Sequence, residues 1–380
     1  MGTIIDYVRE YGCYTFEEKP LNEVDSLVLS QFSYLKFDGL VPGLFDHKRA
    51  VSIGYLNQHE QKDKLFVDKR FADSNYALFT AMCNSFRFGK MKMNYYINEI
   101  NLEEETQFAA ITFYLGKGCT YVAYRGTDET IVGWKEDFNM AFLAPVPGQL
   151  KSVEYMKKMA WRIWGKFYVG GHSKGGNLAV YASMNCMPRL QKRILGVYTH
   201  DGPGFRPEIL ESADFSRIEN KVHKNVPQSS IVGMLLQSQE SYSIIESTSF
   251  GMLQHDPFTW IVEKDHFKKV DKRYESQLFM DETLNEWILQ MDEEEMHFFV
   301  DTLYQVISAA DIDNLIDFSD NWKEKVNSIV EALKELDDVS KEMMKRIVKS
   351  LFDSISFRAK QEIKYKGKQW ITKIKRRKSK

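Results

Sequence analysis

The sequence predicts an α/β protein in which helices flank a mostly parallel sheet, followed by a helical appendage. Strand-like and helix-like runs alternate from residue 108 to residue 200, and a glycine-rich turn joins one such strand directly to a helix. Near residue 280 the composition changes: Glu, Asp and Lys become dense and glycine almost disappears. We therefore expect an α/β domain over residues 1–280 and an α-helical appendage over residues 281–380.

The stretch before the sheet is expected to be mainly helical. Asn22 can cap a helix whose apolar residues fall on roughly one face, and helical spacing returns over residues 76–95. Residues 41–75 contain a Pro-Gly pair, many charges and no firm period. That pattern predicts loops and short helices, and we leave open whether this segment or residues 128–149 form a lid.

The predicted sheet begins with two β-rich runs, residues 108–115 and 120–124, joined by Gly116-Lys117-Gly118 as an antiparallel hairpin. A helix face ends at Gly165, and a further strand follows at once. Strand–helix–strand alternation with this spacing favours parallel pairing. The expected later elements are a helix over 174–186, a strand over 194–199 and β-like runs near residue 222 and over 242–245.

The turn between strand and helix carries the main chemical signal. Gly171, Ser173 and Gly175 form a G-x-S-x-G pattern, with a strand before it and a helix after it. Such a turn is so sharp that side chains at the two glycine positions would collide, and it lifts the serine hydroxyl clear of the sheet. The alternative interpretation is a glycine-rich turn without chemistry.

A serine nucleophile needs a histidine base, and in sheets with this turn the base follows the serine on a late loop. The candidates are His200, His223, His255, His266 and His297. His255 lies in a turn-rich loop after the last β-like run, which is the expected place, although it can also be an ordinary surface histidine. An oxyanion would be held by the Lys174 amide and by a second donor, for which Thr127 at a strand end is the candidate.

Several motifs together resemble a known family. Tyr124-Arg125-Gly126-Thr127 followed by Gly133-Trp134-Lys135-Glu136-Asp137 resembles the F-R-G-[ST]…W…D segment of class 3, fungal-type lipases, and the residues from Gly171 to Ala179 resemble their G-H-S-L-G-G-A-L-A turn. The sequence is more similar still to a bacterial family of lipase-like α/β-hydrolase proteins of uncharacterised function, which shares GHSKGGNLA, DGPGF and QHD. The resemblance covers about residues 20–270. It implies an α/β-hydrolase fold with Ser173 as nucleophile, His255 as base and Thr127 beside the oxyanion.

The sequence departs from the lipase pattern at two positions. Lys174 replaces the leucine after the nucleophile, so a cation either lies next to the site, where it would favour an anionic substrate such as a phospholipid, or points outward. Ser230 occupies the place of the lipase acid. Asp201, at the end of the next strand, is the best substitute; Asp256 would normally point elsewhere, and a dyad without an acid remains open.

Composition limits the other classes of function. The net charge of −2 over 380 residues does not suit a protein built as a nucleic-acid binder, and the four cysteines show no metal or redox spacing. No membrane-spanning run or secretory signal is visible, so we expect a cytoplasmic protein.

The tail from Arg358 carries eleven Lys or Arg and one acid, Glu362, a net charge of +10 that leaves −12 for the rest. Tail 358–380 is either a peripheral contact for an anionic membrane or a solvated basic end.

We therefore expect a serine ester hydrolase, of the lipase and esterase kind, that requires no metal or organic cofactor. By resemblance its substrate is an acyl lipid or phospholipid, although thioesters and small esters remain open. The main alternative is a catalytically inactive hydrolase-fold protein that binds a membrane or a partner. Nucleic-acid binding through the basic tail is a third interpretation, and no recognised domain supports it.

Overall fold

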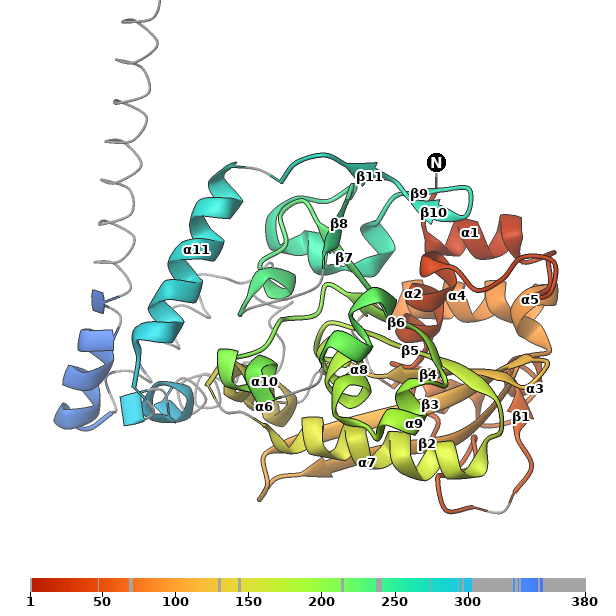
Figure 1. Ribbon diagram of the computed structural model, residues 1–380, viewed down its shortest axis with the longest axis horizontal. Helices are drawn as coiled ribbons and strands as arrows, with labels where there is room; N and C mark the ends of the chain where they lie inside the picture. The colour runs from red at the N-terminus through yellow and green to blue at the C-terminus, as the bar shows by residue number, and fades with distance from the viewer. Residues whose placement is uncertain are drawn as a thin grey trace, which may run out of the picture. The chain divides into compact units, whose positions relative to one another are not determined.

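A computed structural model describes most of the first 292 residues and parts of the rest (Figure 1). The contacts divide the chain into two compact units, residues 1–273 and 274–380, a division slightly before the predicted start of the helical appendage. The described residues are 2–46, 48–67, 71–128, 131–142, 145–212, 215–236, 241–273, 275–292, 294–295, 297–302, 331, 334, 336–347 and 349–350.

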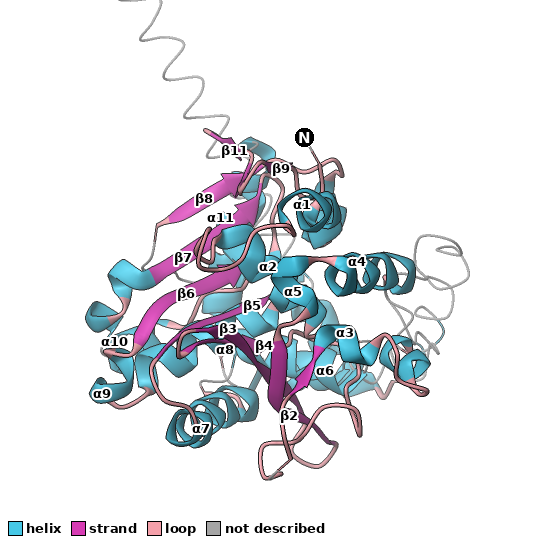
Figure 2. Ribbon diagram, turned by 90° about the vertical axis from the view of Figure 1, so that its right-hand side faces the viewer, coloured by secondary structure: helices cyan, strands magenta, loops and turns pink. Residues whose placement is uncertain are grey.

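A twisted sheet runs through the first unit (Figure 2). Its strands, in spatial order, are β1 (Val51–Ser52), β2 (Lys92–Asn101), β3 (Thr106–Gly116), β4 (Cys119–Tyr124), β5 (Lys166–His172), β6 (Ile194–His200), β7 (Val222–Pro227), β8 (Tyr242–Ile245) and β11 (Lys269–Val270). β9 (Val262–Glu263) and β10 (His266–Phe267) form a small separate ladder.

The central strands have the predicted directions. β3 and β4 form the expected antiparallel hairpin, and β4 to β8 pair in parallel one after another. Parallel neighbours require crossover connections, and α7 (Pro147–Arg162) and α8 (Lys174–Asn185) supply two of them. This is the α/β-hydrolase arrangement, and it brings the carboxyl ends of β4 to β7 to one edge of the sheet.

Helices cover both faces of the sheet (Figure 2). One face carries α1 (Ile4–Tyr11), α2 (Glu23–Phe32) and α4 (Ala72–Asn84), and the other carries α7 and α8. The cap predicted for Asn22 is confirmed, because its side-chain oxygen accepts hydrogen bonds from the amides of Val24 and Asp25, each at 2.9 Å. The remaining helices are α3 (Ile53–Leu56), α5 (Phe86–Gly89), α6 (Ile131–Phe142), α9 (Pro188–Gln191) and α10 (Pro207–Ser212).

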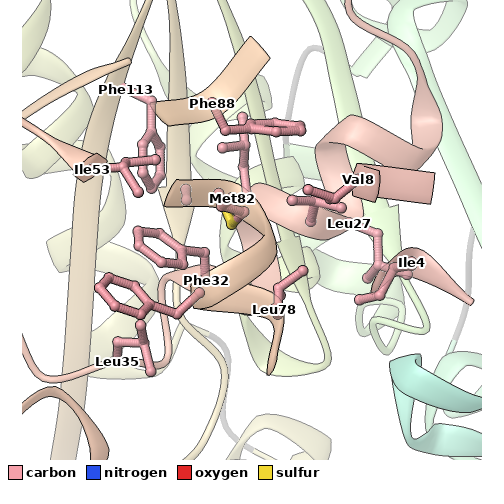
Figure 3. Packing of buried hydrophobic residues seen from close by; sticks show 14 of the residues in the cluster. Ile4, Val8, Leu27, Phe32, Leu35, Ile53, Leu78, Met82, Phe88 and Phe113 are labelled. Carbon is pink, nitrogen blue, oxygen red and sulfur yellow. The ribbon is translucent and has the colours of Figure 1, made fainter. Parts of the chain in front are cut away.

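Each face has its own apolar core. On the α1–α2–α4 face, Phe32, Met82 and Phe113 pack together with their neighbours, as Figure 3 shows. On the α7–α8 face, the buried residues include Met156 and Leu178. The strand that ends at the G-x-S-x-G turn is therefore packed on both sides, which fixes the position of the turn.

The helix predicted over residues 76–95 is wrong in its last part. Residues 72–89 form α4 and α5, but β2 begins at Lys92. The apolar residues there suit either period, and pairing with β3 decides in favour of the strand. A bulge between Asn94 and Ile97 further obscures the alternation, and Tyr95 within it has a φ of +57°.

The second unit is described only in part. α11 (Glu275–Gln290) contributes Trp287, whose Nε1 donates to Ser350 Oγ at 3.0 Å and whose ring lies edge-on to Phe299. The basic tail 358–380 lies outside the described residues. Among the helices that the structure describes, none is both long enough and apolar enough to cross a membrane.

Candidate active site

The serine turn has the geometry that its sequence predicts. β5 ends at His172, α8 begins at Lys174, and Ser173 between them has φ +57° and ψ −132°, a conformation that non-glycine residues rarely adopt. A Cβ at position 171 would lie 2.2 Å from the Gly175 carbonyl carbon, and one at position 175 would lie 2.1 Å from the Tyr124 carbonyl oxygen. Glycine is therefore required at both positions.

Asp201 and His255 meet beside this turn. Asp201 follows the last residue of β6, is fully buried, and has a left-handed φ of +51° held by donation of its amide to the Asn225 carbonyl at 2.8 Å. His255 Nδ1 lies 2.6 Å from Asp201 Oδ2, so the ring donates its Nδ1 proton to the carboxylate. His255 Nε2 is then the nitrogen that can accept a proton.

Ser230, in the place of the lipase acid, lies on the same carboxylate. Its hydroxyl donates a short hydrogen bond to Asp201 Oδ1 and accepts one from the Gly233 amide at 3.0 Å. A Cβ at position 233 would lie 2.3 Å from Asp201 Oδ1, so glycine leaves room for the carboxylate. Ser230 therefore contacts the Asp201 carboxylate and does not supply a carboxylate of its own.

The loop that carries His255 is fixed by its neighbours. Gln254 accepts the Ser229 amide through Oε1 at 2.7 Å, and its backbone carbonyl accepts Trp260 Nε1 at 2.8 Å. Asp256 accepts the Phe258 amide at 2.9 Å, so its side chain caps the turn that follows it. With the loop held in this way, His255 Nδ1 contacts the Asp201 carboxylate.

His172, just before the serine, supports His255 directly, and we did not predict this role from the sequence. His172 Nε2 lies 2.9 Å from the His255 carbonyl oxygen, and the two ring centroids are 4.6 Å apart. Because a carbonyl only accepts, His172 carries its proton on Nε2, and Nδ1 can accept from the Tyr34 hydroxyl at 3.3 Å. The H-S pair is visible in the motif, but the contact of His172 with His255 spans 83 residues, so the motif alone does not predict it.

The segment proposed to hold an oxyanion lies against the turn. A Cβ at position 175 would lie 2.9 Å from the Gly126 amide nitrogen, so α8 begins next to the residue that precedes Thr127. Thr127 Oγ1 donates to Asp137 Oδ2 at 2.5 Å, which ties the end of this segment to α6. The Gly176 amide donates to the Ser173 carbonyl at 2.9 Å. The amides that precede it lie at the start of α8, where helices in general stabilise negative charge.

Both expectations for the Lys174 side chain are wrong. It is 1 % exposed, and its Nζ donates to Glu136 Oε2 at 2.8 Å and to the carbonyl and side-chain oxygens of Gln107 at 3.0 Å each. The cation therefore neither faces a substrate nor points outward. Glu136 also accepts the amides of Gln107 and Gly148, at 3.1 and 2.8 Å, so the buried pair joins β3, α6, α7 and α8.

The other candidate histidines of the first unit do not join the site. His200 is fully buried and bonded to Ser26 Oγ at 2.9 Å, and burial with the nearby His223 lowers its pKa to about 3. Burial also lowers the pKa of His223. His266 is exposed beside Asp265, and His297 belongs to the second unit. Ser173, Asp201 and His255 are therefore the predicted site residues that the fold brings to one place, with Thr127 and Lys174 alongside.

Solved structures similar to this chain include lipases. The native propeptide complex of Rhizomucor miehei lipase is 15% identical, with a TM-score of 0.33 over 56% of this chain and 79% of the other. A structure described as M37 lipase is 16% identical, with a TM-score of 0.32 over 56% and 70% of the two chains. No curated protein matches the chain. The model of the family described as Mbeg1-like matches residues 82–305, more than half of the sequence, and the chain therefore belongs to the Mbeg1-like family.

Proposed function

We propose that this protein is a serine hydrolase that cleaves carboxylic esters through an acyl-enzyme. The contact between His255 Nδ1 and Asp201 Oδ2, on a loop held against the Ser173 turn, carries the proposal. A general base needs one ring nitrogen fixed by a carboxylate and the other directed to the nucleophile's proton, and this contact provides the first requirement.

The reaction would follow from these positions. Ser173 Oγ attacks the ester carbonyl carbon while its proton passes to His255 Nε2, and the carbonyl oxygen becomes an oxyanion. The amides of Lys174 and Thr127 would donate to that oxyanion. Collapse breaks the bond to the alcohol oxygen, which takes the proton from His255, and a water molecule activated by the same histidine then releases the acid.

Acyl lipids or phospholipids are the substrate class that the lipase resemblance favours. The buried Lys174 gives no support to an anionic head group, because its charge is neutralised by Glu136. The alternative of a catalytically inactive protein rested on the absence of the lipase acid. The hydrogen bonds that Asp201 accepts from His255 and Ser230 support the enzyme over this alternative.

Hydrolysis of p-nitrophenyl esters with increasing acyl length tests the proposal and defines the chain preference. Ser173→Ala should lower kcat by more than about 10⁴-fold, as loss of the nucleophile does in serine hydrolases. Ser241→Ala, at an exposed serine outside the site, is the matched control and should behave as wild type. Equal rates for Ser173→Ala and wild type would show that the site does not act through this serine.

A further inference from the structure

A cluster of exposed aromatic and basic side chains lies at the end of the sheet opposite the candidate site. We define the aromatic–basic face as Phe45, Lys158, Arg162, Trp161, Trp164 and Arg189. Trp164 is 90 % exposed, Trp161 64 % and Phe45 62 %, which is unusual for large apolar side chains of a folded domain. They come from the end of α7, the turn that follows it, and the loop before β1.

Cations lie directly on these rings. Lys158 Nζ is 5.0 Å and the Arg162 guanidinium carbon 5.9 Å from the centroid of Phe45, and the Arg189 guanidinium lies 4.9 Å from the Trp161 ring. From Tyr155 to His200 the sequence has eight Lys or Arg and no Asp or Glu. Of these eight, Lys174 is buried at the site. Lys158 also pairs with Glu154 at 2.5 Å, so the positive charge of the face rests mainly on Arg162 and Arg189, in a chain whose first 357 residues carry −12.

Hydrogen bonds fix the backbone at the end of α7, which carries Trp161, and in the turn that follows, which carries Trp164. Arg193 donates to the carbonyls of Ala160, Ile163 and Gly165, at 2.9, 2.8 and 2.7 Å, and so satisfies acceptors at the end of α7. A Cβ at position 165 would lie 2.0 Å from the Gly118 carbonyl oxygen, so the turn also packs closely on the β3–β4 hairpin. The exposed rings are thus presented on a fixed backbone.

We propose that the aromatic–basic face docks on an anionic lipid membrane. Tryptophan side chains favour the headgroup region because the ring is apolar and its N–H can stay hydrated, and Lys and Arg are attracted to anionic lipids. The exposed indoles favour a membrane over a nucleic acid, which would be held mainly through its phosphates. This contact is independent of the proposed hydrolase activity and of the basic tail.

The docked orientation has a consequence for the site. Gly165 precedes the first residue of β5 and Ser173 follows the last, so these two residues lie about 26 Å apart at opposite ends of the strand. A membrane that holds the protein by this face therefore lies away from the serine turn. Docking and ester hydrolysis should be separable by mutation.

The test is co-sedimentation of the full-length protein with vesicles of phosphatidylcholine alone or mixed with phosphatidylglycerol. Wild type should bind the anionic vesicles, and Trp161→Ala with Trp164→Ala should lose most of that binding. Arg162→Ala and Arg189→Ala should each weaken it by about fivefold. Phe86→Ala with Lys90→Ala is the matched control, because Lys90 lies over an equally exposed ring on another face of the first unit, and it should bind like wild type.

The two tryptophan substitutions should leave hydrolysis of a soluble ester unchanged, and brominated lipids should quench the fluorescence of wild type more than that of the double variant. Failure of wild type to bind anionic vesicles would overturn the proposal. Equal binding by wild type and the tryptophan variant would overturn it as well, because the affinity would then belong to another segment. Binding of duplex RNA instead of vesicles, with the same dependence on these residues, would also contradict it. None of the binding outcomes depends on whether the serine is catalytic.

Discussion

His255 Nδ1 donates a hydrogen bond to Asp201 Oδ2 at 2.6 Å, across 54 residues of sequence. Asp201 in turn accepts from Ser230, the residue at the place where the lipase pattern has its acid. A carboxylate at the end of β6 thus reaches the position beside the histidine that a residue after β7 would otherwise occupy. The carboxylate that pairs with the His255 imidazole thus comes from Asp201 after β6, whereas Ser230 after β7 carries no charge.

Asp201→Asn should lower kcat by about 10⁴-fold with little change in folding. The amide keeps the size of the side chain but stabilises neither the required tautomer nor the imidazolium, and the comparable substitution in serine proteases has an effect of this size. Steady-state kinetics on a soluble ester measures it, with thermal unfolding as the check on folding. A loss of less than about tenfold would favour a dyad that works without the acid.

Gly175→Ala should lower kcat by about 10²-fold. The added methyl group would lie 2.1 Å from the Tyr124 carbonyl oxygen, so α8 must move away from the segment that contains Thr127, and displacements near 1 Å have this cost. Gly43→Ala is the matched control, because its nearest atom would lie at a normal 3.5 Å. If Gly175→Ala kept full activity, the oxyanion donors would not depend on this contact.

Lys174→Met should destabilise the fold by about 3–5 kcal/mol, because it leaves the buried Glu136 carboxylate without its cation. Combining it with Glu136→Gln removes the second charge and keeps one oxygen, which can accept one of the two amides that donate to Oε1 and Oε2 of Glu136, so it should recover part of the loss. Urea unfolding of the two single variants and the double variant measures the coupling. Additive losses would mean that the pair does not interact.

His200 should make the fold sensitive to acid. Its pKa is lowered to about 3 from the ordinary 6.5, so between these values the unfolded chain binds a proton that the folded protein does not. The free energy of unfolding should therefore fall as the pH drops below about 6.5, by at most about 1.4 kcal/mol for each pH unit. His200→Gln, compared with wild type by urea unfolding at neutral pH and at about pH 5, should show a smaller fall. Equal falls would assign the sensitivity to other groups.

Much of the sheet could be predicted because its signals are local. The β3–β4 hairpin follows from two β-rich runs with glycines between them, and the serine turn follows from glycines that no other residue can replace. β2 could not be distinguished from a helix because its bulge breaks the alternation, and only pairing with β3 resolves it. Strand pairing depends on residues distant in sequence, which periodicity alone does not contain.

The candidate site, too, was predictable from the sequence only in part. Asp201 and His255 were proposed from their positions after strands, and the structure brings them into contact. The partner of Lys174 and the support from His172 depend on contacts across 38 and 83 residues, so no local pattern shows them. From the sequence, a lysine next to a nucleophile suggests an exposed charge. In the structure Lys174 is instead paired with the buried Glu136.

Labelling of the purified protein with a fluorophosphonate probe tests the central claim most directly. The probe reacts with a serine that its neighbours have already activated. We predict that wild type is labelled at Ser173 and that Ser173→Ala and His255→Ala are not, while Ser241→Ala is labelled like wild type. A folded wild-type protein that resists the probe, or a His255→Ala variant labelled as fast as wild type, would contradict the proposed hydrolase.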